Sequence, residues 1–208
     1  MKLDRILVAT SSADKLREMF QMLGDLPVAP VRPAEVGELP AVLEDGRTFR
    51  DNACKKALAF SEHFGMPVIA EDSGLEVDAL SGRPGVRSRR YAGPAGNDLE
   101  NNLKLLAELE GTPPERRTAR YRCAVALAVP GEVLIVAEGT CEGRIAEKPR
   151  GRGGFGYDPL FFYPPFGVTF GELEAKLKNE VSHRAAALRR FKGFLRERLA
   201  SEPDPLLP

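Results

Sequence analysis

The sequence predicts an α/β protein, and two observations support this prediction. Short apolar runs typical of buried strands alternate with stretches whose apolar residues recur at helical spacing, first over residues 5–23 and again over residues 49–75. The chain of 208 residues is 43% hydrophobic, which is enough for one sizeable domain or for two small lobes that share a cleft. We expect a single domain over residues 1–200 and a frayed tail over residues 201–208.

The first predicted strand, residues 5–9, leads into a hydroxyl-rich turn and then into a helix. The turn consists of Thr10, Ser11, Ser12, Ala13, Asp14 and Lys15, and the apolar face of the helix consists of Leu16, Met19, Phe20 and Leu23. Free amides at a helix start, hydroxyls and the Lys15 cation suit a phosphate, while N-capping by Ser11 or Ser12 is the structural alternative. The turn lacks the G-x-x-x-x-G-K-[ST] pattern, which excludes a Walker-type loop.

A second strand is expected over residues 28–31, and a strong helix follows Thr48. Thr48 suits the N-cap of this helix, and Gly65 suits its end. The predicted apolar stripe consists of Phe49, Ala53, Ala57, Phe60 and Phe64. Glu44 and Asn52 lie near the helix start, where Glu44 is either a solvated loop residue or an acid that faces Asp72.

The apolar run from Val68 is expected to be a buried strand that ends at two adjacent acids, Glu71 and Asp72. Neighbouring carboxylates are costly to desolvate, so they persist most easily beside a hard cation or a basic ligand. We expect Gly74 to let the backbone turn there, and Val77 to belong to a return strand. The structural alternative is an acidic turn that caps the next element.

Residues 83–93 contain four arginines within eight positions and are expected to form a basic, mobile segment. Such a segment is either a solvated loop or a cover for a polyanion. A helix that begins at Asn97 or Asp98 and closes at Gly111 should follow. Its leucines are Leu99, Leu103, Leu106 and Leu109.

Alternating apolar residues over 116–129, a Pro-Gly-Glu turn and a second run over 133–137 predict a long hairpin. Arg120 and Arg122 either line a cleft or decorate the edge of the sheet. Residues 151–159 contain a glycine-rich loop with Phe155 and Tyr157, before a strand over 160–162. The loop is either an ordinary hairpin connection or an aromatic platform for a nucleobase.

A capping box at Thr169 is expected to open a short helix toward Lys178. Ser182 should begin the last helix, whose predicted apolar face consists of Leu188, Phe191, Leu195 and Leu199. His183 and Arg184 occupy its first turn, where cations oppose the helix dipole. Their placement indicates that they serve a ligand or an acid.

Composition narrows the cofactors and partners. Cys54, Cys123 and Cys141 include no close pair, which disfavours a disulfide framework and a thiolate zinc site. With only His63 and His183, a histidine zinc site is also hard to form. Any metal should therefore have oxygen ligands, which suits Mg²⁺, Mn²⁺ or Ca²⁺. Thirty basic residues balance thirty acidic ones, so we expect no stable nucleic-acid partner. The absence of a long apolar run predicts no membrane partner and a cytoplasmic location.

Several motifs, taken in order along nearly the whole chain, closely resemble the non-canonical purine nucleoside triphosphate pyrophosphatase family, also called the inosine triphosphate pyrophosphatase family. They are Thr10-x-Ser12-x-x-Lys15, Glu44-x-Gly46-x-Thr48-Phe49-x-x-Asn52-Ala53, Glu71-Asp72-Ser73-Gly74-Leu75, Pro84-Gly85-Val86, Ser88-x-Arg90-Tyr91, Gly153-Gly154-Phe155-Gly156-Tyr157-Asp158-Pro159 and Ser182-His183-Arg184. The resemblance implies a two-lobed α/β fold with a mixed central sheet, flanking helices and a deep cleft. It also implies a homodimer that uses Mg²⁺, with Mn²⁺ as a substitute, to hydrolyse ITP, dITP and XTP to the monophosphate and pyrophosphate.

The resemblance assigns roles to individual residues. Glu44 and Asp72 match the metal ligands, and Asp72 with its neighbour Glu71 matches the catalytic position. The matches to the substrate-binding set are Thr10, Ser11, Ser12, Ala13, Asp14, Lys15, Asn52, Ser73, Phe155, Gly156, Tyr157, Asp158, Lys178, His183 and Arg184. This chain has Ser12 where the family commonly has Asn, and Glu71 where it often has Asp.

In the expected mechanism Asp72 or Glu71 takes a proton from water, and Lys15 and Lys178 hold the triphosphate. Arg184 and the amides of residues 155–158 would donate to a 6-oxo purine, whereas adenine would present a donor to those donors. One alternative is a nucleotide pyrophosphatase with another base preference. The other is a noncatalytic nucleotide- or RNA-binding module that uses the arginines of residues 83–90 and 116–122.

Overall fold

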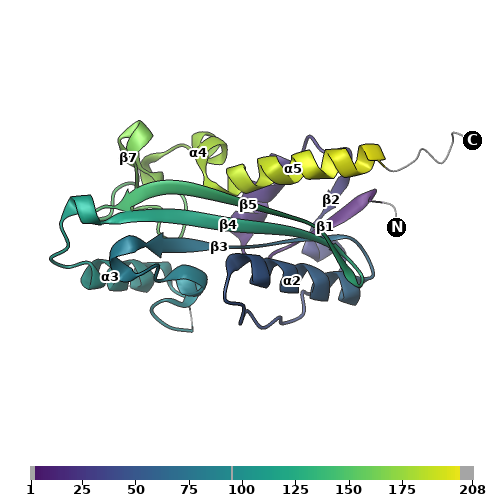
Figure 1. The fold of residues 1–208 in the computed structure, drawn as a ribbon, viewed down its shortest axis with the longest axis horizontal. Coiled ribbons are helices and arrows are strands. Elements are labelled where there is room, and N and C mark those ends of the chain that lie inside the picture. Colours follow the sequence, from purple (N-terminus) through teal and green to yellow (C-terminus); the bar gives the residue numbers. More distant parts are fainter. Residues whose placement is uncertain (1–2, 95, 202–208) are drawn as a thin grey trace, which may run out of the picture.

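The computed structural model describes residues 3–94 and 96–201, and within these residues seven strands form one sheet in the order β2-β1-β3-β4-β5-β6-β7 (Figure 1). The strands are β1 Arg5–Ala9, β2 Ala29–Val31, β3 Val68–Val77, β4 Thr118–Val129, β5 Glu132–Ile145, β6 Phe161–Tyr163 and β7 Val168–Thr169. β1 is parallel to β2 and β3, and the other pairs are antiparallel. The mixed α/β sheet predicted from the sequence is therefore confirmed.

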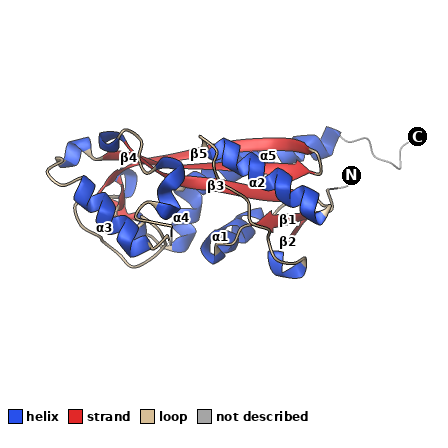
Figure 2. Ribbon diagram, turned by 90° about the horizontal axis from the view of Figure 1, so that it is seen from below, coloured by secondary structure: helices blue, strands red, loops and turns tan. Residues whose placement is uncertain are grey.

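Helices cover both faces of the long strands, as Figure 1 shows for α5 above and α2 below. Their bounds are α1 Ala13–Leu23, α2 Phe49–Phe64, α3 Asp98–Glu108, α4 Ala175–Val181 and α5 His183–Ser201. α1 and α5 share one apolar cluster with Ile69 and Val125, while α2 packs on alanines of β3 and β4 on the opposite face. Figure 2 shows α1 beside β1 and β2, α3 at the opposite end of the molecule, and α4 between α3 and α1.

The helix starts agree with the local sequence signals. The Ser12 hydroxyl accepts a hydrogen bond from the Lys15 amide, and Thr48 forms a capping box with Asp51. Gly65 ends α2 in the left-handed conformation at φ 62°. Ser182 caps α5, because its hydroxyl accepts a hydrogen bond from the Ala185 amide.

Three local expectations at β3 are wrong. The strand does not end at Glu71 and Asp72, because it pairs with β4 from Val68 as far as Val77, and so Val77 belongs to no return strand. Gly74 does not turn the chain. A Cβ at Gly74 would lie 2.3 Å from the Ser88 hydroxyl, so this glycine permits a close approach within the strand.

Elsewhere, the arginine-rich stretch forms a 3₁₀ helix, Gly85–Arg90, where we expected a loop. The Thr169 capping box closes only the 3₁₀ turn Phe170–Glu172, and α4 begins separately after Glu174. α3 forms as expected from Asn97, but of its predicted leucine stripe Leu99 and Leu103 are exposed, while Leu106 and Leu109 pack in the core. Of the predicted tail, residues 202–208 lie outside the described residues, and Ser201 is the last residue of α5.

α5 lies so close to β5 that one position tolerates no side chain. A Cβ at Gly139 would lie 2.2 Å from the His183 carbonyl oxygen and 2.3 Å from the Ala187 nitrogen. Backbone cannot yield as a flexible side chain can, so the helix would have to move away from the sheet.

We expect Gly139→Ala to lower the free energy of unfolding by about 3 kcal/mol, measured by urea denaturation. Gly193→Ala is the matched control, because a Cβ at Gly193 in α5 meets nothing within 4 Å. This control should raise stability by up to about 1 kcal/mol. Equal effects of the two substitutions would contradict the close packing of α5 on β5.

Candidate functional site

A cavity of about 530 Å³ lies where β1 stops and β3 continues. β1 pairs with β3 only as far as Ala70, so the next four residues of β3 line the cavity on the edge where β1 is no longer their neighbour. From the predicted set the cavity is lined by Thr10, Ser11, Ser12, Asp14, Lys15, Glu44, Glu71, Asp72, Ser73, Phe155, Gly156, Tyr157, Asp158, Lys178, His183 and Arg184. Ala13 and Asn52 do not line it.

Adjacent acids of β3 point to opposite faces of the sheet, as strand geometry requires. Glu71 faces α1 and α5, where it meets Lys15 and Arg184. Asp72 faces α2, where it meets Asn52 and Lys56. The cavity therefore wraps around the free edge of one strand and contains two separate charged groups.

The first group is built around Glu71, whose side chain is fully buried. Lys15 Nζ lies 2.6 Å from Glu71 Oε1, Arg184 Nε lies 2.9 Å from Oε2, and the Cys123 thiol lies 3.2 Å from Oε2. Burial alone would raise the pKa of Glu71, but Arg184 and Lys15 outweigh it and hold the pKa well below its usual range. Glu71 is thus a fixed anion that orients two cations.

Glu18 of α1 extends this group and was missed in the sequence. Its carboxylate bonds to Arg184 and also lies 3.0 Å from Lys178 Nζ, which in turn lies 2.5 Å from Asp158. Glu18 is one helical turn after Lys15, so it lies on the same face of α1, and this spacing is the signal that could have identified it. The chain of contacts joins α1, β3, α4 and α5.

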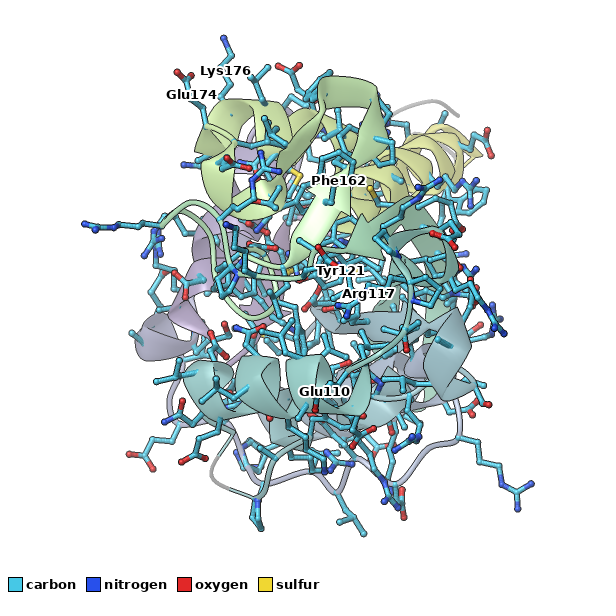
Figure 3. All side chains as sticks on the ribbon, turned by 90° about the vertical axis from the view of Figure 1, so that its left-hand side faces the viewer. Glu110, Arg117, Tyr121, Phe162, Glu174 and Lys176 are labelled. Carbon is cyan, nitrogen blue, oxygen red and sulfur yellow. The ribbon has the colours of Figure 1, made fainter. Side chains whose placement is uncertain are left out.

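The position of Lys178 on α4 contrasts with that of its neighbours. Figure 3 shows Glu174 and Lys176 pointing outward from the molecule, whereas the Lys178 side chain is only 5% exposed. Its ammonium lies 4.4 Å from the centre of the Phe155 ring. An ammonium group that is buried against an aromatic ring has already lost most of its water, so it can bind a polar ligand in the cavity at little further cost.

The second charged group surrounds Asp72. Asn52 donates to Asp72 Oδ2 at 3.0 Å and accepts from the Gly46 amide at 2.8 Å, which ties the loop that carries Glu44 to this acid. Lys56 Nζ lies 3.1 Å from Glu44 and 3.2 Å from Asp72 Oδ1. Burial raises the pKa of Asp72 although Lys56 and Lys15 oppose the change.

Lys56 was also missed in the sequence. It lies four residues after Asn52, within the stripe of α2 that faces the core, and a lysine on a buried stripe was the available signal. Its ammonium shows that Glu44 and Asp72 converge on one point where a cation is stabilised. Among the described residues no cluster of three His, Cys, Asp or Glu side chains could hold a metal ion. Two carboxylates nevertheless suffice for Mg²⁺ when substrate phosphates supply further oxygens.

One end of the cavity is aromatic. The His183 ring stacks on Tyr121 with centroids 4.6 Å apart, and Tyr121, which Figure 3 shows in the interior, donates to Asp158 at 3.2 Å. Burial, followed by the charge of Arg184, holds the pKa of His183 well below its usual range, so the imidazole is neutral. Its buried Nδ1 has no hydrogen-bond partner among the described residues.

Most of the donors that we expected to face a 6-oxo group already have acceptors. The Phe155 amide donates to Asp158 at 2.9 Å, and the Gly156 amide donates to Asp98 at 2.7 Å. Arg184 donates to Glu18, Glu71 and Ser73. These bonds hold the walls of the cavity in place.

The predicted basic segment divides between the cavity and the surface. Arg89 lines the cavity, and Arg90 donates to the Glu44 carbonyl at 2.9 Å. Arg120 lies outside the cavity and pairs with Asp78 and Glu142 at 2.9 and 3.1 Å.

None of the helices in the described part of the chain combines the length and the apolar character needed to cross a membrane.

Comparisons with known proteins agree with this geometry. The dITP/XTP pyrophosphatase of Geobacillus kaustophilus is 52% identical over 183 residues, which cover 88% of this chain and 90% of that protein. The structure of a HAM1 protein from Coxiella burnetii has a TM-score of 0.84 and 39% identity, and covers 93% of this chain and 98% of its own. The Staphylococcus aureus Ham1 structure has a TM-score of 0.83 and 35% identity, over 93% of this chain and 99% of its own.

The resemblance that the motifs indicated is therefore confirmed. The profile of the Ham1 family matches residues 6–194. This chain belongs to the Ham1 family.

Proposed function

We propose that this protein hydrolyses the non-canonical purine nucleoside triphosphates XTP, ITP and dITP to the monophosphate and pyrophosphate. The cavity supports this proposal because its two charged groups lie on opposite faces of β3, with an aromatic end beside one of them. Such an arrangement matches a ligand with an aromatic base and a polyanionic tail. The name of the Geobacillus kaustophilus relative, dITP/XTP pyrophosphatase, supports the same substrate class.

In the proposed reaction a water oxygen forms a bond to the α-phosphorus, and the bond from that phosphorus to the oxygen bridging to the β-phosphate breaks. Pyrophosphate leaves with the bridging oxygen, and the water proton passes to Asp72. Asp72 suits this role because Asn52 fixes its Oδ2 while Oδ1 faces Lys56 and the cavity. Glu71 is less suited, because its side chain is fully buried and Lys15 and Arg184 hold its pKa well below the usual range, whereas burial raises the pKa of Asp72.

The remaining residues bind and orient. We assign the polyphosphate to Lys15, Lys56 and the amides of the turn 10–15, and the base to Phe155, Lys178 and His183. Glu71 and Glu18 are positioning residues, because they hold Lys15, Arg184 and Lys178 in place without facing a reacting atom.

Glu44 and Asp72 would hold a divalent ion, Mg²⁺ or Mn²⁺, at the point where Lys56 now contacts both. Such an ion would neutralise the charge that develops on phosphate oxygens during the reaction. The balanced net charge of the chain supports a small-molecule substrate and no nucleic-acid partner. We further propose a cytoplasmic location. We also propose a homodimeric assembly, which sedimentation analysis would test.

The substrate assignment predicts rapid pyrophosphate release from XTP, ITP and dITP with Mg²⁺. The rate with ATP should be lower by at least about 100-fold, because the Lys178 ammonium is only a donor and would face the 6-amino donor of adenine, whereas it can donate to a 6-oxo group. GTP has the same 6-oxo group as ITP and differs by its 2-amino group, so the ratio of the two rates measures how strongly the site rejects a 2-amino group. Equal rates for ITP and ATP would favour a pyrophosphatase without this base preference.

Asp72→Asn should lower kcat for XTP by at least about 100-fold, because the amide cannot take the water proton. Binding of XTP, measured by calorimetry, should persist. Glu76→Gln is the control, since Glu76 lies on the same strand outside the cavity. Turnover that survives in the Asp72 variant would exclude Asp72 as the proton acceptor.

The metal assignment predicts that chelation with EDTA abolishes turnover and that Mg²⁺ or Mn²⁺ restores it. Glu44→Gln should raise the Mg²⁺ concentration needed for the half-maximal rate by about tenfold, because it removes one of only two carboxylate ligands. Asp45→Asn, which changes the exposed neighbour that pairs with Lys55, should leave that concentration unchanged. Full turnover in EDTA would refute a metal-dependent reaction.

A further inference from the structure

The first half of α3 buries asparagines in place of the leucines that the sequence indicates, whereas Leu105 and Leu109 toward its C-terminal end are buried as usual. Leu99 and Leu103 are 66% and 57% exposed, whereas Asn101 and Asn102 are 2% and 9% exposed. Burying amide groups is unfavourable unless they form hydrogen bonds. When a fold overrides its local pattern in this way, a functional constraint is the usual reason.

The polar face of α3 holds both backbone groups of one residue in the nucleobase loop. The Gly156 amide donates to Asp98 Oδ2 at 2.7 Å, and Asn102 Nδ2 donates to the Gly156 carbonyl at 2.9 Å. Gly156 has a φ of 63° and stands between Phe155 and Tyr157. Two bonds to its backbone therefore fix the course of the loop that carries both rings.

The same helix also holds the facing wall of the cavity. Asn101 Nδ2 donates to the Arg89 carbonyl at 3.0 Å, and Asn101 Oδ1 accepts from the Ala92 amide at 2.7 Å. The Tyr157 hydroxyl donates to the Ser88 carbonyl at 2.7 Å, which joins the two walls directly. α3 is thus bonded to both sides of the cavity at the end where Phe155 lies.

We propose that Asp98 and Asn102 are positioning residues for the nucleobase pocket. They hold the Gly156 peptide, and through it they set the distance of the Phe155 ring from Lys178 and Arg184, which lie 4.4 and 5.7 Å from its centre. A base that stacks on Phe155 meets Lys178 and Arg184 at its edge only if the loop keeps this course. The inference rests on the proposed function for the identity of the ligand, and it assigns the choice of purine partly to α3, whose residues Asp98 and Asn101 line the cavity.

The test compares Asp98→Ala, Asp98→Asn and Asn102→Ala with Glu100→Ala in three measurements: XTP and GTP turnover, pyrophosphate inhibition and IMP binding by calorimetry. Asp98→Ala and Asn102→Ala should raise the KM for XTP and the Kd for IMP about tenfold, the effect of one lost hydrogen bond. Inhibition by pyrophosphate and kcat should stay within about twofold of the native values, and the preference for XTP over GTP should narrow. Asp98→Asn keeps an acceptor for the Gly156 amide and should behave like the native protein.

Glu100→Ala is the matched control because it removes the same charge from the same turn of α3. The Glu100 side chain is exposed and makes no hydrogen bond or ion pair with the residues that the structure describes. If Asp98→Ala matches this control, the inference is overturned. Equal losses of IMP and pyrophosphate binding, together with a lower Tm, would also overturn it, since they would indicate a purely structural role.

IMP binding does not require turnover, which separates this inference from the proposed function. A native protein that binds IMP but releases no pyrophosphate from XTP would refute the hydrolase proposal alone. In that case the ratio of IMP affinities between Asp98→Ala and Glu100→Ala still decides whether α3 positions the loop. A native protein that releases pyrophosphate from XTP but binds no IMP would overturn this inference alone, and one that does neither would overturn both.

Discussion

The ion pairs around Glu71 are the contacts on which the site depends. A fully buried carboxylate is stable here because Lys15 and Arg184 bond to it, and Glu18 then bonds to Arg184 and Lys178. Removing one member of such a network leaves an uncompensated buried charge, which costs about 3–5 kcal/mol. The same contacts hold the start of α5 and the end of α4 against α1, so the stability of this region and the shape of the cavity have one physical origin.

The second constraint is the difference in length between two parallel strands. β1 stops at Ala9, whereas β3 continues to Val77, and helices cover both faces of the sheet at this point. Consecutive residues of β3 therefore supply groups of different character. Glu71 is an inert anion between two cations, while Asp72 keeps one oxygen toward the cavity, although the two acids are adjacent in the sequence.

Much of this arrangement could be predicted from the sequence, and the failures share a cause. Caps at Ser12, Thr48 and Ser182 depend on neighbouring residues, so their elements were predicted correctly. The end of β3, the role of Lys56 and the polarity of α3 depend on which segments pair across the fold, and local spacing does not contain this information. Leu99 and Leu103 of α3 were misleading for the same reason, because the turn that meets the cavity walls buries Asn101 and Asn102 instead.

The free edge of β3 has a mechanical consequence. A molecule lodged there touches groups rooted in α2 on one face and groups rooted in α1 and α5 on the other. These layers are otherwise separated by the sheet and share no apolar cluster among the described residues. A bound ligand would therefore contact both layers at once, and it would add a direct path by which motions of one layer reach the other.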